Sequence, residues 1–197
     1  MKKVVILISG NGSNMVQLVS SLRGEHPGRC ALVLSDNAGA GGLALANEMR
    51  VATAAVHRPQ FADRDSFETT LAEYIDVAEP DIICLAGFMR ILSPGFVNRY
   101  KGMMMNIHPS LLPAHRGLDT HARVLAAGET VTGATVHLVT EHLDDGPILG
   151  QIRVPVLADD TPETLAERVL KAEHRLYPRV LRRFAEGLTD RVDMDLA

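Results

Sequence analysis

The sequence predicts an α/β protein with a Rossmann-like, mostly parallel twisted sheet of about seven strands and helices on both faces. Apolar stretches rich in β-branched residues recur along the 197 residues, and segments with helical spacing separate the early ones. Such alternation indicates right-handed βαβ crossovers, which place helices on both faces of a sheet. The last two stretches lack a long helix between them, so part of the sheet near the C-terminal end is expected to be antiparallel.

The expected strands are the apolar stretches, which end at polar or glycine-containing turns. In chain order they cover residues 4–8, 31–34, 51–56, 81–86, 102–107, 132–139 and 148–154. Helices are expected where apolar residues recur every three or four positions. This spacing joins Met15, Leu18, Val19 and Leu22, and also Phe67, Leu71, Tyr74, Ile75 and Ala78.

A last helix is expected to start at Thr161-Pro162, because proline is favoured in the first turn. Its apolar stripe is Leu165, Val169, Ala172 and Leu176. Pro178 is expected to kink this helix, and Gly187 to end it. The sequence thus predicts one domain over residues 1–187, followed by a loosely held C-terminal tail over residues 188–197.

Composition indicates a soluble globular protein, with 46% hydrophobic and 22% charged residues. No apolar run is long enough for a membrane span, and the opening "MKKVVILISGNGSN" is interpreted as a first strand because its apolar part ends in a polar turn. Cys30 and Cys84 stand alone, which favours a reducing cytoplasm. The net charge of −4 and the lack of a basic block argue against nucleic acid as a partner.

The glycine-rich turn "ISGNGSNM", residues 8–15, lies between the first strand and a helix. Backbone N–H groups and the positive end of a helix dipole suit an anionic ligand such as a phosphate. Asp36 mimics the ribose-binding acid of dinucleotide sites, but Met15 stands where their third glycine belongs. A plain strand-to-helix turn is the alternative interpretation.

Asn106 and His108 lie at the carboxyl end of the fifth expected strand. Residues i and i+2 of a strand share a face, and open α/β sheets bind ligands at the carboxyl ends of their strands. An amide and an imidazole can donate to an oxygen that becomes negative during acyl transfer. The alternative is that His108 only satisfies the backbone of a proline-rich loop.

The acidic loop "TEHLDDGPILG", residues 140–150, offers a partner for this histidine. A carboxylate from Asp144 or Asp145 beside His108 would raise the imidazole pKa above its ordinary value and keep it protonated enough to act as an acid. The alternative is an acidic turn at the surface, in which Gly146-Pro147 are the turn-forming residues.

Together, "ISGNGSN", "LAGFMRILS", "NIHPSLLP", "HLDDGPI" and "AEHRLYP" resemble the formyltransferase superfamily that uses 10-formyltetrahydrofolate. More narrowly, they resemble its phosphoribosylglycinamide formyltransferases of purine biosynthesis. The resemblance implies the formyltransferase fold and a direct attack of the amine of glycinamide ribonucleotide on the formyl carbon. It implies that Asn106 and His108 steady the oxyanion and move a proton, and that Asp144 tunes the histidine.

The same resemblance implies two sets of binding residues. The ribonucleotide would be held by Gly12, Ser13, Asn14 and Glu173. The folate would contact Arg64, Met89, Arg90, Ile91, Leu92, Asn106 and the backbone of Thr140, Glu141, His142, Leu143 and Asp144. Phe88, Met89, Ile91 and Leu92 suit a flat pterin, and the two arginines suit its glutamate tail. Leu112-Pro113 resembles a cis peptide of the family.

Two departures from the family pattern are His115-Arg116, where an aromatic residue and proline are common, and Asp145, where a small residue is common. The expected partners are small molecules, with 10-formyltetrahydrofolate as co-substrate and without metal, nucleic acid or membrane, in a monomer or homodimer. Related transformylases with an additional domain would need a longer chain. A formyltransferase for amino-sugar nucleotides and a non-catalytic nucleotide-binding module remain the alternatives.

Overall fold

The computed structural model describes residues 1–196, which form eight strands, six α-helices and one 3₁₀ helix. The strands are β1 (Lys2–Ile8), β2 (Gly28–Ser35), β3 (Thr53–Ala55), β4 (Ile82–Leu85), β5 (Met104–His108), β6 (Val131–Leu138), β7 (Ile148–Pro155) and β8 (Val192–Asp195). The helices are α1 (Ser13–Ser21), α2 (Gly41–Glu48), η1 (Arg58–Gln60), α3 (Arg64–Ala78), α4 (Pro94–Arg99), α5 (Thr120–Ala126) and α6 (Pro162–Ala185).

The strands follow the order β3-β2-β1-β4-β5-β6-β7-β8. β1 pairs in parallel with β2 and β4, and β2 pairs in parallel with β3. β6 and β7 are antiparallel, whereas β7 and β8 are parallel. The mostly parallel α/β sheet with an antiparallel part near the C-terminal end is therefore confirmed, with one strand more than the seven expected.

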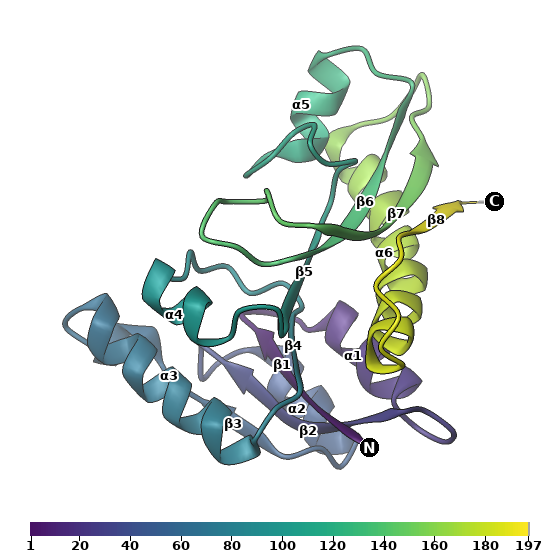
Figure 1. The fold of residues 1–197 in the computed structure, drawn as a ribbon. Helices are drawn as coiled ribbons and strands as arrows, with labels where there is room; N and C mark the ends of the chain where they lie inside the picture. The colour runs from purple at the N-terminus through teal and green to yellow at the C-terminus, as the bar shows by residue number, and fades with distance from the viewer. Residues whose placement is uncertain (197) are drawn as a thin grey trace. The chain divides into compact units, whose positions relative to one another are not determined.

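The chain divides into two compact units, residues 1–105 and 106–197. In the first unit, residues 4–8 of β1 are fully buried, as expected for a parallel strand whose two faces are both covered. Helix α3 packs on β1 and β2, while α2 packs on β2 and β3 and against α1 (Figure 1). The apolar spacing that predicts α1 and α3 therefore marks the faces that they bury.

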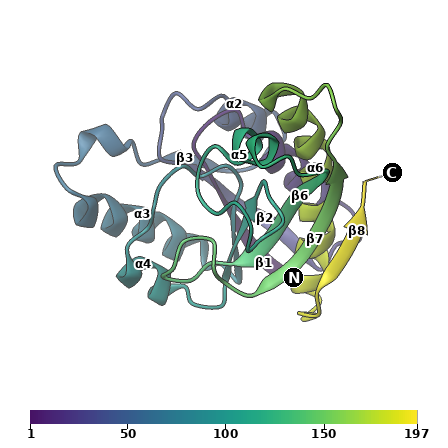
Figure 2. The ribbon, with the colours of Figure 1, turned by 90° about the horizontal axis from the view of Figure 1, so that it is seen from above.

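In the second unit, α6 packs on β6 and β7, which run side by side with β8 (Figure 2). Thr161 and Thr164 cap the start of α6 reciprocally, because each side chain accepts a hydrogen bond from the other residue's backbone N–H. The predicted apolar stripe is buried in full. The helix continues through Pro178 to Ala185, so this proline lies inside it.

Strand β8 differs from the expectation of a loosely held tail over residues 188–197. Val192–Asp195 pairs in parallel with β7, and Val192 is buried. The backbone of β7 offers this segment hydrogen-bond partners, and burial of one valine adds an apolar contact, so the segment forms a strand despite its polar composition. Ala197, the last residue of the expected tail, lies outside the described residues.

The prediction of one domain over residues 1–187 remains a prediction.

No helix within residues 1–196 has both the length and the apolar character needed to cross a bilayer.

Candidate active site

Strand β5 presents Asn106 and His108 on one face, as the period of a strand requires. Their neighbours Met105 and Ile107 are buried in the core. The Asn106 amide lies 3.3 Å from His137 Nε2, and the His108 imidazole lies 3.3 Å from the Asp144 carboxylate. All four polar side chains belong to the second unit, so the structure brings the three predicted catalytic residues together.

The His108 ring faces a hydrogen-bond acceptor at each nitrogen. Nε2 lies 2.9 Å from the carbonyl oxygen of His115, and Nδ1 lies 3.3 Å from Asp144 Oδ2. A neutral imidazole carries one N–H and can satisfy only one acceptor, whereas an imidazolium satisfies both. These two contacts therefore favour the charged form of His108.

Burial acts against that charged form. The His108 and Asp144 side chains are each only 7% exposed. Burial lowers the pKa of His108 below its ordinary value of 6.5, although the His115 carbonyl and the Asp144 carboxylate act to raise it. The expected net rise is therefore wrong in direction, because loss of water around the ring outweighs the attraction of the carboxylate.

The loop between β6 and β7 places Asp144 beside His108. Asp144 adopts a left-handed backbone conformation, with φ of 49°, and its Oδ2 accepts a hydrogen bond of 2.9 Å from the Gly117 N–H. At Gly146 a Cβ atom would lie 1.7 Å from the Leu138 carbonyl oxygen, so only glycine allows this close approach. Asp145, by contrast, forms an ion pair with Arg116.

Asp144 remains ionised in this environment. Burial acts to raise its pKa, but His137, the Gly117 N–H and the positive charge that His108 can carry hold the pKa below its usual value. Of the two candidate carboxylates, only Asp144 lies beside His108. The Leu112-Pro113 peptide in the neighbouring loop is cis, as expected.

His137 is a member of the cluster that sequence reasoning missed. Its Nδ1 lies 2.9 Å from the carbonyl oxygen of Leu138, and its Nε2 lies 3.3 Å from Asn106 Nδ2 and 3.6 Å from Asp144 Oδ1. If Nδ1 carries the proton, Nε2 accepts from Asn106 and fixes which way that amide points. The period of two along β6 puts Thr135 and His137 on one face, which is the signal that could have identified it.

The predicted phosphate loop lies in the first unit, at the start of α1. Gly12 adopts a left-handed conformation there, with φ of 75°, and glycine has no side chain to cap the helix. The loop also approaches the start of α2, because Gly42 N donates to Gly10 O at 3.0 Å and a Cβ on Gly12 would lie 2.9 Å from Gly42 Cα. Ser13 and Asn14 form the first turn of α1.

The segment after β4 carries the predicted folate contacts of the first unit. Met89 and Ile91 are 73% and 71% exposed, which is unusual for large apolar side chains. Arg90 Nε donates to the buried Asp36 carboxylate at 2.6 Å. Asp36, which mimics the ribose-binding acid of dinucleotide sites in sequence, thus forms an ion pair with an arginine of this chain. Arg64 is exposed at the start of α3.

The remaining predicted contacts lie in the second unit. Glu173 is buried on α6. Among residues 140–144 of the loop between β6 and β7, Thr140 is half-buried, residues 141–143 are exposed and Asp144 is buried. This loop can therefore offer its backbone to a ligand while Asp144 faces His108.

Comparisons with known proteins show the family of this chain. The sequence profile of a family described as formyl transferase matches residues 2–181. A phosphoribosylglycinamide formyltransferase of Escherichia coli (strain K12) is 43% identical over 185 residues, which cover 93% of this chain and 87% of that protein. A trifunctional purine biosynthetic protein adenosine-3 of Bos taurus is 45% identical over 188 residues, and this chain spans 18% of its length.

A solved structure gives the same result for the fold. The crystal structure of phosphoribosylglycinamide formyltransferase from Brucella melitensis has a TM-score of 0.90 and 53% sequence identity with this chain, over 95% of this chain and 97% of that one. The chain, with its Asn106, His108 and Asp144 gathered in one unit, belongs to the formyl transferase family.

Proposed function

We propose that this chain transfers the formyl group of 10-formyltetrahydrofolate to the amine of glycinamide ribonucleotide, a cytoplasmic step of de novo purine biosynthesis. Membership of the formyl transferase family implies a folate-derived formyl donor. The names of the Escherichia coli and Brucella melitensis relatives support the acceptor. The observation that carries the proposal is the cluster of Asn106, His108 and Asp144 at the end of β5.

The cluster supplies what a direct transfer requires. The amine nitrogen attacks the formyl carbon, a C–N bond forms, and the formyl oxygen becomes negative. Asn106 Nδ2 donates to that oxygen, and the contact of 3.3 Å between Nδ2 and His137 Nε2 keeps the amide in place. No covalent intermediate with the protein is part of this proposal.

His108 moves the proton. Because burial lowers its pKa, His108 is neutral near pH 7 and can accept the proton that the attacking amine releases. The imidazolium that forms is stabilised by Asp144 at 3.3 Å. His108 then returns the proton to N10 of the folate as the bond from that nitrogen to the formyl carbon breaks. The substrate replaces the His115 carbonyl at Nε2 during this step.

The binding roles follow the family resemblance. Gly12, Ser13 and Asn14 bind the phosphate through the start of α1, where backbone N–H groups and the helix dipole favour an anion. Glu173 contacts the same ribonucleotide. The folate contacts Asn106, residues 89–92, of which 89–91 are exposed, Arg64 and the backbone of residues 140–144.

An absorbance assay of folate deformylation with the purified chain tests this function. We expect turnover with glycinamide ribonucleotide and none with amino-sugar nucleotides. Turnover only with an amino-sugar nucleotide would replace the proposed acceptor. Tight binding of a dinucleotide without any formyl transfer would instead favour a non-catalytic binding module.

A further inference from the structure

We propose that Gln151, oriented by Arg191 just before the C-terminal strand β8, is a positioning residue for the loop that follows His108. The inference rests on the proposed role of His108. It concerns a hydrogen-bond network that links β8, at the sheet edge, to the backbone of the catalytic loop.

The inner part of the network holds the peptide groups next to Pro109. The fully buried Thr135 hydroxyl donates to the Ser110 carbonyl at 2.6 Å and accepts from the Leu112 N–H at 3.0 Å. The loop is closed further by Ser110 Oγ, which donates to the Ala114 carbonyl at 2.6 Å. Two of the four residues that follow His108, Ser110 and Leu112, are therefore hydrogen-bonded to β6.

Gln151 lies directly opposite Thr135 in the antiparallel pair of β6 and β7. Its Nε2 donates to the Leu112 carbonyl at 2.9 Å and to Thr135 Oγ1 at 2.8 Å. Because a carbonyl oxygen only accepts, the nitrogen of this amide has to face the loop. If the amide were turned over, two oxygens would face each other in a buried place, which is costly.

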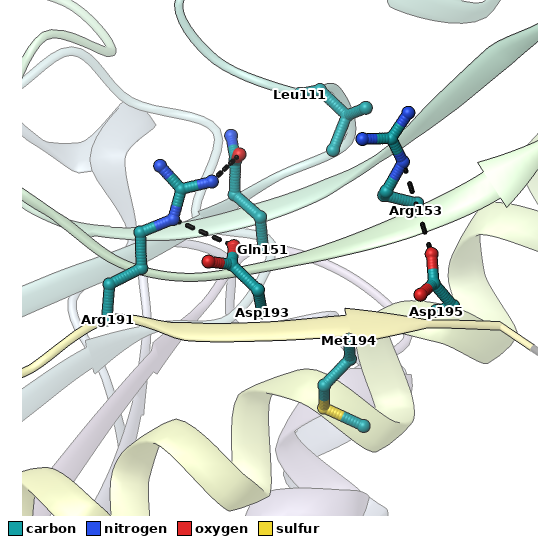
Figure 3. A pocket seen from close by; sticks show the side chains of 7 residues that line it. All are labelled: Leu111, Gln151, Arg153, Arg191, Asp193, Met194 and Asp195. Carbon is teal, nitrogen blue, oxygen red and sulfur yellow. Dashed lines mark hydrogen bonds and ion pairs between the residues drawn. The ribbon is translucent and has the colours of Figure 1, made fainter.

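Arg191 favours the required orientation of that amide. Its Nη2 donates to Gln151 Oε1 at 2.7 Å, and its Nε donates to Asp193 at 2.8 Å (Figure 3). A guanidinium can only donate, so it pairs with the amide oxygen and leaves the amide nitrogen for Leu112. Asp193 fixes the guanidinium in turn. The orientation of a buried amide beside the catalytic loop thus depends on a residue just before β8.

Arg153, also drawn in Figure 3, is a matched control for a substitution of Arg191. Both Arg191 and Arg153 line a cavity of about 280 Å³ beside β7 and β8. Among the described residues, the Arg153 side chain forms one ion pair, with the exposed Asp195 at 4.0 Å, and it is 64% exposed. Removing Arg153 therefore removes the same charge from the same cavity without touching the amide of Gln151, which makes it a matched control.

The network acts on His108 through its backbone. If Leu112 and Ser110 shift, the peptides after His108 shift as well, and the imidazole loses its alignment with Asp144. Small displacements of a catalytic group lower turnover far more than they lower substrate binding. The expected signature is therefore a fall in kcat with little change in KM.

The test compares steady-state kinetics of Arg191→Met, Gln151→Glu and the control Arg153→Met. Gln151→Glu keeps the shape of the side chain and an oxygen for Arg191, but it places an acceptor against the Leu112 carbonyl. We expect kcat to fall roughly tenfold in both network variants and KM to change less than about twofold. Arg153→Met should behave like the unaltered chain.

Three further measurements separate positioning from a loss of folded protein. The acidic limb of the kcat profile should shift in Arg191→Met, because the alignment of His108 with Asp144 changes. Arg191→Lys, which restores a donor, should recover most of the lost kcat. In a Gln151→Met background, Arg191→Met should add less than about twofold, since the amide that it orients is gone.

The outcomes also distinguish this inference from the proposed function. Unchanged kcat and pH profile in Arg191→Met, together with an inactive His108→Ala, would overturn the positioning role and leave the function standing. Equal losses in Arg191→Met and Arg153→Met would overturn it too, by pointing to charge alone. Near-full activity of His108→Ala would remove the catalytic role on which both proposals depend.

Discussion

Replacing Asp144 by asparagine isolates the charge of this carboxylate from its shape. Asp144 has φ of 49°, and asparagine is among the residues that tolerate this left-handed conformation best. The amide oxygen of the new side chain can still accept from the Gly117 N–H. The loop between β6 and β7 should therefore keep its path, and any change in rate should report the lost negative charge.

The size of the effect follows from the distance to His108. Two unit charges separated by 3.3 Å attract by about 5 kcal/mol at an effective dielectric constant of about 20. Asparagine retains a partial negative charge on its oxygen, and the cost of burying a carboxylate disappears, so the net loss is smaller, about 3 kcal/mol. We therefore expect Asp144→Asn to lower kcat roughly 100- to 200-fold.

The pH profile supplies a second readout with a defined sign. Asp144 acts to raise the pKa of His108, while burial lowers it. Without the carboxylate, the effect that raises the pKa of His108 is lost while burial still lowers it, so the pKa falls further. Because His108 has to be neutral to accept the proton of the amine, the acidic limb of kcat should move to lower pH.

The measurement is kcat against pH in the folate absorbance assay, with Asp145→Asn as control. Asp145 is the adjacent carboxylate, but it pairs with Arg116 at the surface. We expect its variant to keep kcat within about twofold, as is usual for exposed ion pairs. An unshifted acidic limb in Asp144→Asn, with kcat reduced less than about fivefold, would refute the proposed coupling of this carboxylate to His108.

Three other predictions can be tested on the same protein. His108→Ala and Asn106→Asp should each lower kcat about 100-fold or more while the far-UV circular dichroism stays unchanged; near-full turnover would contradict their roles. Gly146→Ala should cost about 3 kcal/mol in urea unfolding, because its Cβ would lie 1.7 Å from a carbonyl oxygen of β6; an unchanged midpoint would be inconsistent with this packing. Burial lowers the pKa of His108, His121 and His174 in the folded chain, so below about pH 6.5 the unfolded chain takes up protons before the folded chain does. The free energy of unfolding should therefore decrease as the pH is lowered from about 7.5 to about 5.5, and a urea midpoint that increases on this acidification would show the opposite sign.

Much of the fold could be predicted because its elements are governed by local rules. The run of buried residues in β1 and the helical spacing from Phe67 to Ala78 each identify an element from short stretches of sequence. Strand β8 could not be found in this way. Its polar sequence gives no strand signal, and it forms because β7 offers an edge for pairing.

The candidate site likewise has features that a local sequence pattern predicts and features that it does not. The period of two on β5 predicts that Asn106 and His108 share a face, and the cluster agrees with it. The same rule applied to β6 would have drawn attention to His137. A local sequence pattern does not predict how deeply a particular atom is buried. Burial decides the direction in which the pKa of His108 is shifted. A charge partner can be guessed from sequence, whereas the loss of water around a ring depends on the packed structure.

The opposing influences on His108 suit its proposed task better than either would alone. If only the acceptors acted, the imidazole would remain charged near pH 7 and could not take the proton of the attacking amine. If only burial acted, the imidazolium would be too costly to form, and the proton could not be held until the leaving nitrogen needs it. Asp144 reduces that cost during the transfer, while burial keeps the resting ring neutral. A group that both accepts and returns a proton within one turnover requires this balance, which depends on how accurately the loop after His108 is held.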